Sequence, residues 1–241
     1  MLRTFQTLVL VCLAAGPSAL VAQSSLVPVF SELQTLAGDN GWEPLEFPDI
    51  ERHTRYTLVT DNGRQVVEAR ADDSASGMIA RVSLVPGDSL TLRWSWKVAN
   101  VLEDGDARRK SGDDYPARIY VAFEFEPDKA GWFERARRKT VSTLFGEELP
   151  GRALNYIWAN RLPRGEIIAN PYTDDTMMIA VNSGQDQASQ WVTVERDIVA
   201  DYRRAFGSEP PGLLGVAIMT DTDNTGDTAK AWYGDIILER P

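Results

Sequence analysis

The sequence is poorest in the residue types that carry thiol and imidazole chemistry. It has one cysteine and one histidine among 241 residues. Because Cys12 lies in an N-terminal apolar segment, the rest of the chain can form no disulfide and offers no thiol nucleophile. A zinc site built on several histidines is excluded, and a Ser–His–Asp triad would have to use His53. His53 follows Arg52 at the start of an expected strand, where we expect a surface position.

The sequence also lacks familiar catalytic motifs and long apolar runs. Neither a Gly-x-Ser-x-Gly motif nor a phosphate-binding glycine loop occurs. Residues 1–22 predict a secretory signal peptide, with Arg3 before the apolar stretch Leu8–Ala15 and a cut after Ala22. That stretch is too short to span a bilayer, and no later stretch is long enough. An exported chain without cysteines fits the bacterial periplasm or the cell exterior.

Basic residues are fewer than acidic ones, with 25 Lys and Arg against 35 Asp and Glu. The formal net charge is −10, and removal of residues 1–22 takes away one more positive charge, Arg3. This balance argues against nucleic acid or an anionic membrane surface as a partner. Residues 23–241 show no linker, repeat or low-complexity segment and suit a single domain with one core. The sequence does not indicate an oligomeric state.

Short alternating segments dominate the chain. The clearest is Ser89–Val98, where an aliphatic and tryptophan face alternates with a polar face, so Trp94 and Trp96 are expected in the core rather than on a ligand platform. Ten such strands are expected, namely Thr54–Thr60, Gln65–Arg70, Met78–Leu84, Ser89–Val98, Ala117–Phe125, Ala153–Asn160, Thr176–Asn182, Gln190–Asp197, Leu213–Thr220 and Ala231–Leu238. The pattern predicts an all-β fold, an antiparallel β-sandwich of the jelly-roll type.

Helical spacing occurs in three places. Ser25–Ala37 predicts an extended lead and a short helix, and Asp197–Phe206 predicts a helix that ends at Gly207. Pro127–Gly146 predicts a basic amphipathic helix; packing on the sandwich is favoured over membrane contact. One or two of these helices are expected at the periphery of the sandwich.

An acidic loop follows the strand Leu213–Thr220. Its sequence from residue 221 to residue 227 is DTDNTGD, and its oxygen-bearing side chains resemble those of a calcium loop. The EF-hand pattern itself is absent. Three interpretations stay open: a hairpin turn, a Ca²⁺ site, or a direct ligand contact. The expected metal ligands are Asp221, Asp223, Asn224 and Asp227.

A second charged loop, Glu103–Pro116, leads into the strand Ala117–Phe125. The loop is either a solvated connection or part of a site. Arg118 and Tyr120 project from the polar face of that strand; they would contact a ligand if the face is open, whereas Arg118 would pair with Asp113 or Asp114 if the face is covered. The expected ligand contacts are Lys110, Asp113, Asp114, Arg118, Tyr120, Asn155, Tyr156 and Trp158.

Five stretches together resemble one family. They are RWSWKV, KSGDDYPARIYVAFEF, GRALNYIW, NPYT and GVAIMTDTDNTGDTAKAWYGDI, and in this order they are similar to the DUF3047 family of exported bacterial proteins of unknown function. The resemblance spans nearly all of residues 23–241 and implies no activity. More loosely, the strand AWYGDIIL after an acidic loop is similar to carbohydrate-binding and galactose-binding-like jelly rolls.

Three classes of function are open on this sequence. A non-catalytic binding module for a carbohydrate or another hydroxyl-rich envelope ligand is the favoured hypothesis, with Ca²⁺ as an optional cofactor. A glycan-active hydrolase or lyase would need a carboxylate pair from Asp113, Asp114, Glu124, Asp221 and Asp223, and no motif selects one. An envelope structural or protein-interaction role would require an exposed apolar patch.

Overall fold

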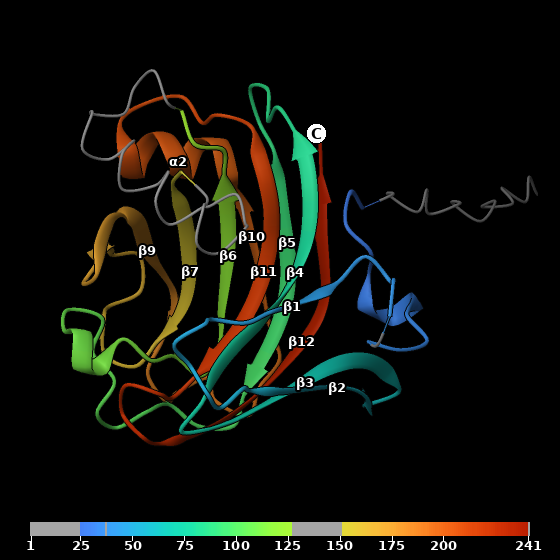
Figure 1. Cartoon of the computed structure of the whole chain (residues 1–241), viewed down its shortest axis with the longest axis vertical. Helices are drawn as coiled ribbons and strands as arrows, with labels where there is room; N and C mark the ends of the chain where they lie inside the picture. Colours follow the sequence, from blue (N-terminus) through green and yellow to red (C-terminus); the bar gives the residue numbers. More distant parts are fainter. Residues whose placement is uncertain (1–24, 37, 127–150, 241) are drawn as a thin grey trace, which may run out of the picture.

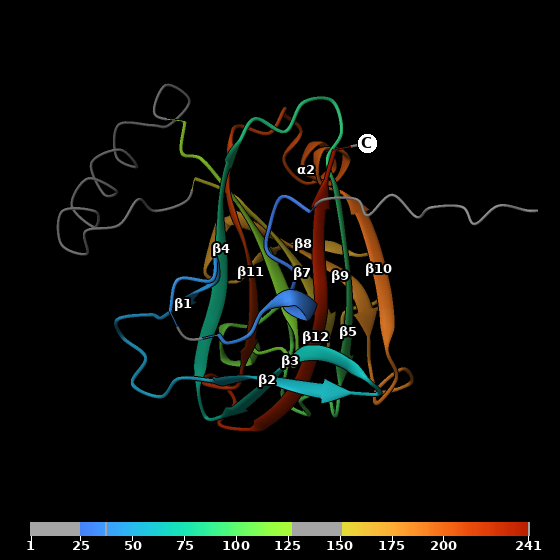
Figure 2. The same ribbon diagram turned by 90° about the vertical axis from the view of Figure 1, so that its right-hand side faces the viewer.

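In the part of the chain that the structure describes, the fold consists of two β-sheets packed face to face, with one α-helix at one end (Figures 1 and 2). It comes from a computed structural model, which describes residues 25–36, 38–126 and 151–240. The order in the seven-stranded sheet is β1 (Glu43–Leu45), β4 (Ala75–Leu84), β11 (Leu213–Asp221), β6 (Arg118–Phe123), β7 (Ala153–Ala159), β9 (Thr173–Ser183) and β8 (Ile167–Asn170). The order in the five-stranded sheet is β10 (Val192–Asp197), β5 (Thr91–Val98), β12 (Thr228–Glu239), β3 (Arg64–Asp72) and β2 (Arg55–Asp61).

Neighbouring strands are antiparallel throughout, with one exception. β7 and β9 run parallel, and β8 then returns antiparallel along β9. The prediction of an all-β antiparallel sandwich is therefore confirmed. The ten expected strands all form, although their ends move by up to three residues, and the sequence missed the short strands β1 and β8.

The core lies between the two sheets and is rich in aromatic rings. Trp94 and Trp96 on β5 are almost wholly buried, as the alternation predicted. They meet aromatic rings of the opposite sheet: the ring centroids of Trp94 and Tyr156 are 5.3 Å apart, and those of Trp96 and Trp158 are 6.0 Å apart. Each large aromatic side chain removes about 150–250 Å² from water, so these contacts are a main source of stability.

The helix α2 (Ile198–Phe206) forms where the sequence predicts it. Asp197 caps its first turn by accepting hydrogen bonds from the backbone N–H of Val199 and Ala200, and Gly207 ends it with a φ of 69°. The expected helix in Ser25–Ala37 is a single 3₁₀ turn, η1 (Phe30–Glu32). The helix expected at Pro127–Gly146 lies outside the described residues.

One expected connection is different in the structure. β11 and β12 do not form a hairpin, because β11 lies in the seven-stranded sheet and β12 in the five-stranded sheet. The loop between them, residues 222–227, therefore crosses from one sheet to the other. In the part of the chain that the structure describes, no helix is long and apolar enough to cross a membrane.

Candidate functional site

The two charged loops meet over the outer face of the seven-stranded sheet. β6 and β11 are neighbours with Met219 opposite Arg118, so the end of β11 lies beside the start of β6. The loop that precedes β6 is joined to β11 by a hydrogen bond of 3.2 Å from the N–H of Asp221 to the carbonyl of Tyr115. This brings together a group that we call the acidic rim, which consists of Asp113, Asp114, Arg118, Asp221 and Asp223.

Arg118 is the cation of the acidic rim and is only 4% exposed. Its Nη2 donates a hydrogen bond to Asp221, and its Nη1 lies 3.9 Å from Asp113. Burial by itself lowers the pKa of Arg118, but the Asp221 carboxylate raises that pKa well above its ordinary value. The face is therefore covered at this point and Arg118 forms a buried ion pair. Its principal partner is Asp221, which the sequence reasoning had not considered for this role.

Several polar atoms of this region have no hydrogen-bond partner. Among the described residues, these buried atoms include Nε and Nη1 of Arg118, Oδ1 of Asp221 and Oδ1 of Asn155. Buried polar groups in proteins are almost always paired with protein, water or a bound ligand. These unpartnered donors and acceptors indicate that the region can accommodate a further polar group.

Asp114 fixes the shape of the crossover loop. It is fully buried, and its carboxylate accepts hydrogen bonds from the backbone N–H of Asn224 at 3.0 Å and of Thr225 at 2.7 Å. The side chains of the same two residues donate to it as well, at 3.1 Å and 2.7 Å. The four donors compensate the buried charge and tie residues 222–227 to the loop before β6.

Tyr172 was missed by the sequence reasoning and is an exposed aromatic residue of the site. It is 54% exposed and, in the described part of the chain, no other aromatic side chain is classed as exposed. Its hydroxyl lies 2.7 Å from Oδ1 of Asn224 and 3.2 Å from the carbonyl of Lys110. The Nζ of Lys110 is 5.1 Å from the ring centroid. The only signal in the sequence was an aromatic residue within the turn-forming stretch Asn170–Asp175.

The carboxylates also form a set that suits a hard cation. Asp114, Asp221 and Asp223 each offer one oxygen, and the three oxygens lie within 4.8 Å of one another. Ca²⁺ is bound by six to eight oxygen ligands, and a wholly oxygen donor set with one free oxygen on Asp221 fits such an ion. Burial and the neighbouring charge of Asp114 raise the pKa of Asp223, which a bound cation would reverse.

The other expected metal ligands lie differently. The side chain of Asn224 is engaged with Asp114 and Tyr172. Asp227 accepts a hydrogen bond of 2.7 Å from the N–H of Thr228 and does not belong to the three-carboxylate set. The structure thus places two of the four expected ligands, Asp221 and Asp223, in one cluster and adds Asp114 to them.

The expected ligand contacts on β6 and β7 divide between the two faces of the sheet. Tyr120 is half-buried on the outer face, and its ring centroid lies 5.4 Å from the Arg118 guanidinium. Asn155, opposite Tyr120, is fully buried and donates a hydrogen bond to the sulfur of Met178.

Tyr156 and Trp158 point the other way, into the core, and have no exposed surface. The hydroxyl of Tyr156 donates to Asp201 at 2.9 Å, and the indole N–H of Trp158 donates to the carbonyl of Gly184 at 3.0 Å. A ligand on the outer face cannot reach either ring, which corrects the expectation for these two residues. Glu124 lies beyond the opposite end of β6 from Arg118, so it is not part of the acidic rim.

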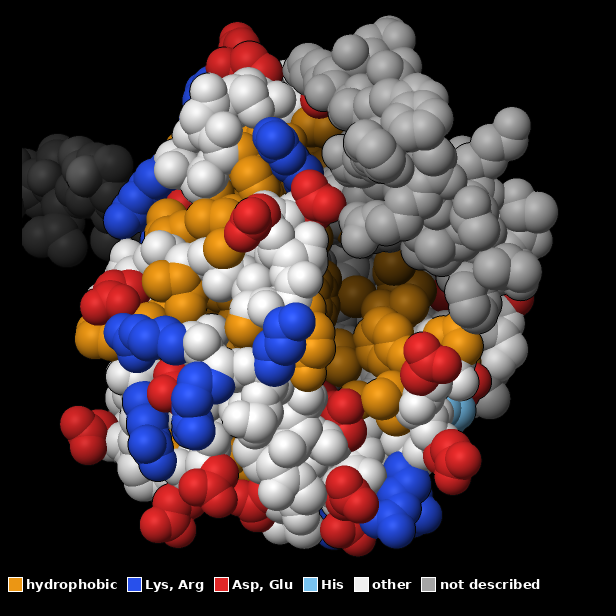
Figure 3. Space-filling view, turned by 60° about the vertical axis from the view of Figure 1, so that its left-hand side comes forward, with side chains coloured by type: hydrophobic (Ala, Val, Ile, Leu, Met, Phe, Trp, Pro, Cys, Tyr) orange, Lys and Arg blue, Asp and Glu red, His pale blue; other side chains and the backbone are white. Residues whose placement is uncertain are grey.

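The surface on this side of the molecule is hollowed. Figure 3 shows a depression whose floor is made of hydrophobic side chains, with acidic and basic side chains along its lower edge.

Comparison with known proteins gives distant structural likenesses. The carbohydrate recognition domain of Emp47p is 11% identical, with a TM-score of 0.45, and the match covers 92% of this chain and 98% of that chain. The lectin from Bauhinia forficata in complex with GalNAc is 10% identical, with a TM-score of 0.38 and coverage of 85% and 94%. The cellulose induced protein Cip1 is 12% identical, with a TM-score of 0.36 and coverage of 84% and 92%. Because every score is below 0.5, we infer nothing about this chain from them.

Sequence comparison gives a firmer result. No curated protein matches the chain. Residues 40–237 match the family DUF3047, which is described as "Protein of unknown function". Since this match covers well over half of the chain, the protein belongs to the DUF3047 family.

Proposed function

We propose that the protein is an exported, non-catalytic binding module, and that Tyr172 and the adjoining acidic rim bind a carbohydrate or another hydroxyl-rich ligand. The observation that carries the proposal is the exposed ring of Tyr172, whose hydroxyl is held by Asn224 and by the carbonyl of Lys110. Sugars bind through their apolar faces to fixed aromatic rings and through their hydroxyls to carboxylates and amides. A ring fixed in advance loses little conformational entropy on binding.

The groups beside the ring supply the polar half of such a site. Asp223 is only partly buried, and Asn224 neighbours it in the same loop. Asp114 holds this loop in place through four hydrogen bonds, so the polar groups are positioned before a ligand arrives. The buried ion pair of Arg118 and Asp221 joins the start of β6 to the end of β11, where the two loops begin and end. Because Asp114 and Asp221 are engaged in these structural contacts, the site is better suited to binding than to a reaction that needs two free carboxylates.

The test is glycan binding by the mature protein and its variants, measured by a glycan panel and then calorimetry. We expect Tyr172→Ala to weaken binding at least tenfold and Tyr172→Phe to retain most of it, because the ring surface carries the stacking. Val85→Ala is the matched control, since Val85 is a 73% exposed apolar residue elsewhere on the surface. If no glycan binds, or if Tyr172→Ala binds as wild type does, the proposal fails and a protein-interaction role takes its place.

A second candidate function, Ca²⁺ binding, is favoured by the cluster of Asp114, Asp221 and Asp223. We expect Ca²⁺ to raise the melting temperature relative to EDTA, since a ligand that binds only the folded state stabilises it by mass action. Asp223→Asn should abolish this shift, whereas Asp227→Asn should leave it unchanged. Equal melting with Ca²⁺ and EDTA would show that Arg118 and the donors of Asn224 and Thr225 compensate the carboxylates without a metal.

A further inference from the structure

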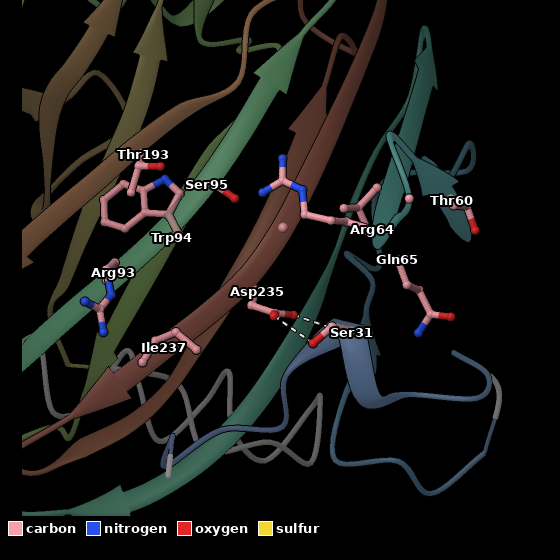
Figure 4. Close-up of a pocket in the computed structure, with 13 residues that line it drawn as sticks. Ser31, Thr60, Arg64, Gln65, Arg93, Trp94, Ser95, Thr193, Asp235 and Ile237 are labelled. Carbon is pink, nitrogen blue, oxygen red and sulfur yellow. Dashed lines mark hydrogen bonds between the residues drawn. The ribbon is translucent and has the colours of Figure 1, made fainter. Parts of the chain in front are cut away.

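A second hollow lies on the other side of the molecule, on the outer face of the five-stranded sheet (Figure 4). Its volume is about 590 Å³, within the range of sites for small ligands. Neighbouring strands β10, β5, β12 and β3 form its floor and walls, and η1 closes one end. None of its lining residues belongs to the acidic rim, so it is a separate site.

The hollow exists because small residues interrupt a face that is otherwise covered by long side chains. On β5, Ser95 lies between Arg93 and Lys97, which project from the same face. Beside it on β12 is Gly234, where the pairing with β5 shifts register. A Cβ at Gly234 would lie 2.3 Å from the Oγ of Ser95, so a larger residue there would displace the Ser95 side chain.

One guanidinium extends over this floor. Arg64, at the start of β3, reaches across the hollow towards Ser95 (Figure 4). Its guanidinium carbon lies 5.0 Å from the ring centroid of Trp191. The indole of Trp191 is held in turn by a hydrogen bond of 2.7 Å to Asp61. A cation–π contact of this kind uses none of the guanidinium N–H groups as a hydrogen bond to a carboxylate, so they remain available to a ligand.

Arg64 differs from three neighbouring cations of this face, Lys97, Lys230 and Arg93, in having no carboxylate within ion-pair distance. Lys97 pairs with Asp61 at 2.8 Å, Lys230 with Glu68 at 2.8 Å and Arg93 with Glu239 at 3.0 Å. Within residues 25–36, 38–126 and 151–240, the side chain of Arg64 forms neither an ion pair nor a hydrogen bond. A planar guanidinium with free edge donors is the side chain best suited to hold a carboxylate through two parallel hydrogen bonds.

The rest of the hollow offers groups that suit hydroxyls. The side chains of Ser95 and Thr193 line it and can donate or accept. Asp235 also lines it, and its carboxylate is oriented by the N–H and the hydroxyl of Ser31 at 2.8 Å and 2.7 Å. A carboxylate held in this way can accept hydrogen bonds from ligand hydroxyls, whereas it repels an anion that approaches closely. The ligand should therefore carry its negative charge at one end, beside Arg64, and hydroxyls at the other.

We propose that this hollow binds a carboxylated sugar, a uronic acid unit of an acidic glycan, with the carboxylate on Arg64 and the ring hydroxyls on Ser95, Thr193 and Asp235. The proposal does not depend on the site at Tyr172. It extends the range of ligands from neutral hydroxyl-rich compounds to acidic ones.

The test is calorimetric titration of the mature protein with a galacturonate oligomer. The comparison ligands are a neutral glucose oligomer of equal length and a sulfated oligosaccharide. We expect the galacturonate oligomer to bind at least tenfold more tightly than either. Arg64→Ala should lose at least tenfold in affinity, and Arg64→Lys should lose nearly as much, because an ammonium cannot form the paired contact.

The control variants separate this site from general charge and from the site at Tyr172. Arg55→Ala removes an exposed arginine of the same sheet that does not line the hollow, and it should change galacturonate affinity less than twofold. Tyr172→Ala should leave it unchanged. Absence of galacturonate binding, equal binding of the neutral oligomer, or equal losses in Arg64→Ala and Arg55→Ala would each overturn the proposal. Preference for the sulfated ligand would overturn the choice of a carboxylate.

Discussion

At the scale of single residues, the buried pair of Arg118 and Asp221 dominates the energetics of the acidic rim. Both side chains are at most 5% exposed, so each charge depends on the other for compensation. We expect Arg118→Ala to lower the free energy of unfolding by about 3–5 kcal/mol, because it leaves the Asp221 carboxylate buried and unpaired. Urea unfolding at neutral pH measures the loss.

The matched control is Arg81→Ala. Arg81 also pairs with a carboxylate, that of Glu43, but the two side chains are 59% and 50% exposed. Exposed pairs contribute about 0–1 kcal/mol, so this variant should be close to wild type. If Arg118→Ala and Arg81→Ala lower the free energy of unfolding by similar amounts, burial does not make the ion pair of Arg118 more important for stability.

Asp61 gives a prediction about pH. Hydrogen bonds from Lys97 and from the indole of Trp191 lower the pKa of its carboxyl below the ordinary value. A lowered pKa in the folded state stabilises the fold above the unfolded pKa of about 4, and this contribution is lost as the pH falls through the folded pKa. Asp61→Asn should therefore cost about 0.5–1 kcal/mol at pH 7, and progressively less as the pH falls below the unfolded pKa of about 4. Urea midpoints across this range test it, and a constant difference at every pH would contradict it.

At the scale of elements, the clearest prediction concerns the start of α2. Asp197 accepts hydrogen bonds from two backbone N–H groups of the first turn and one from the hydroxyl of Ser89 at 3.0 Å. Asp197→Ala should lower stability by about 1 kcal/mol, since two backbone donors lose their partner. Asp197→Asn retains an acceptor and should lose less. Thermal or urea unfolding measures both, and equal losses would show that the charge rather than the cap matters.

The same scale shows what the sequence could predict. Period-two alternation identified β5 and its buried face, because one face is apolar and the other polar. It failed on β7, where all seven residues are buried, so the pattern could not tell which face meets the opposite sheet. Tyr156 and Trp158 were therefore expected as ligand contacts although they lie in the core. Asn155 lies on the outer face but is covered as well.

Connections were harder to predict than strands. A turn-rich loop between two apolar runs is typical of a hairpin, yet residues 222–227 join the two sheets. Which strand pairs with which depends on contacts between distant segments, and those are absent from local periodicity. For the same reason the sequence suggested Asp113 or Asp114 as the partner of Arg118; Asp113 does form an ion pair with it at 3.9 Å, but the sequence missed the closer partner Asp221, which follows Arg118 by 103 residues.

At the scale of the whole molecule, the two proposed sites lie on opposite outer faces of the sandwich. The acidic rim belongs to the seven-stranded sheet, and the hollow under Arg64 belongs to the five-stranded sheet. The rim is rich in carboxylates, and the hollow presents an unpaired guanidinium. The two sites should therefore prefer ligands of different charge: the acidic rim should bind neutral or cationic groups, and the hollow should bind carboxylates.

The rigid core between the faces leads to the last prediction. Substitutions at sites that share no contacts add within about 0.3–0.5 kcal/mol, and a well-packed core separates these two sites. The double variant Tyr172→Ala/Arg64→Ala should thus lose neutral-glycan affinity as Tyr172→Ala alone does and galacturonate affinity as Arg64→Ala alone does. Titration of each ligand in the presence of a saturating amount of the other should give unchanged affinities. A coupling of more than tenfold between the ligands would show that the faces communicate through the core or that both ligands occupy one site.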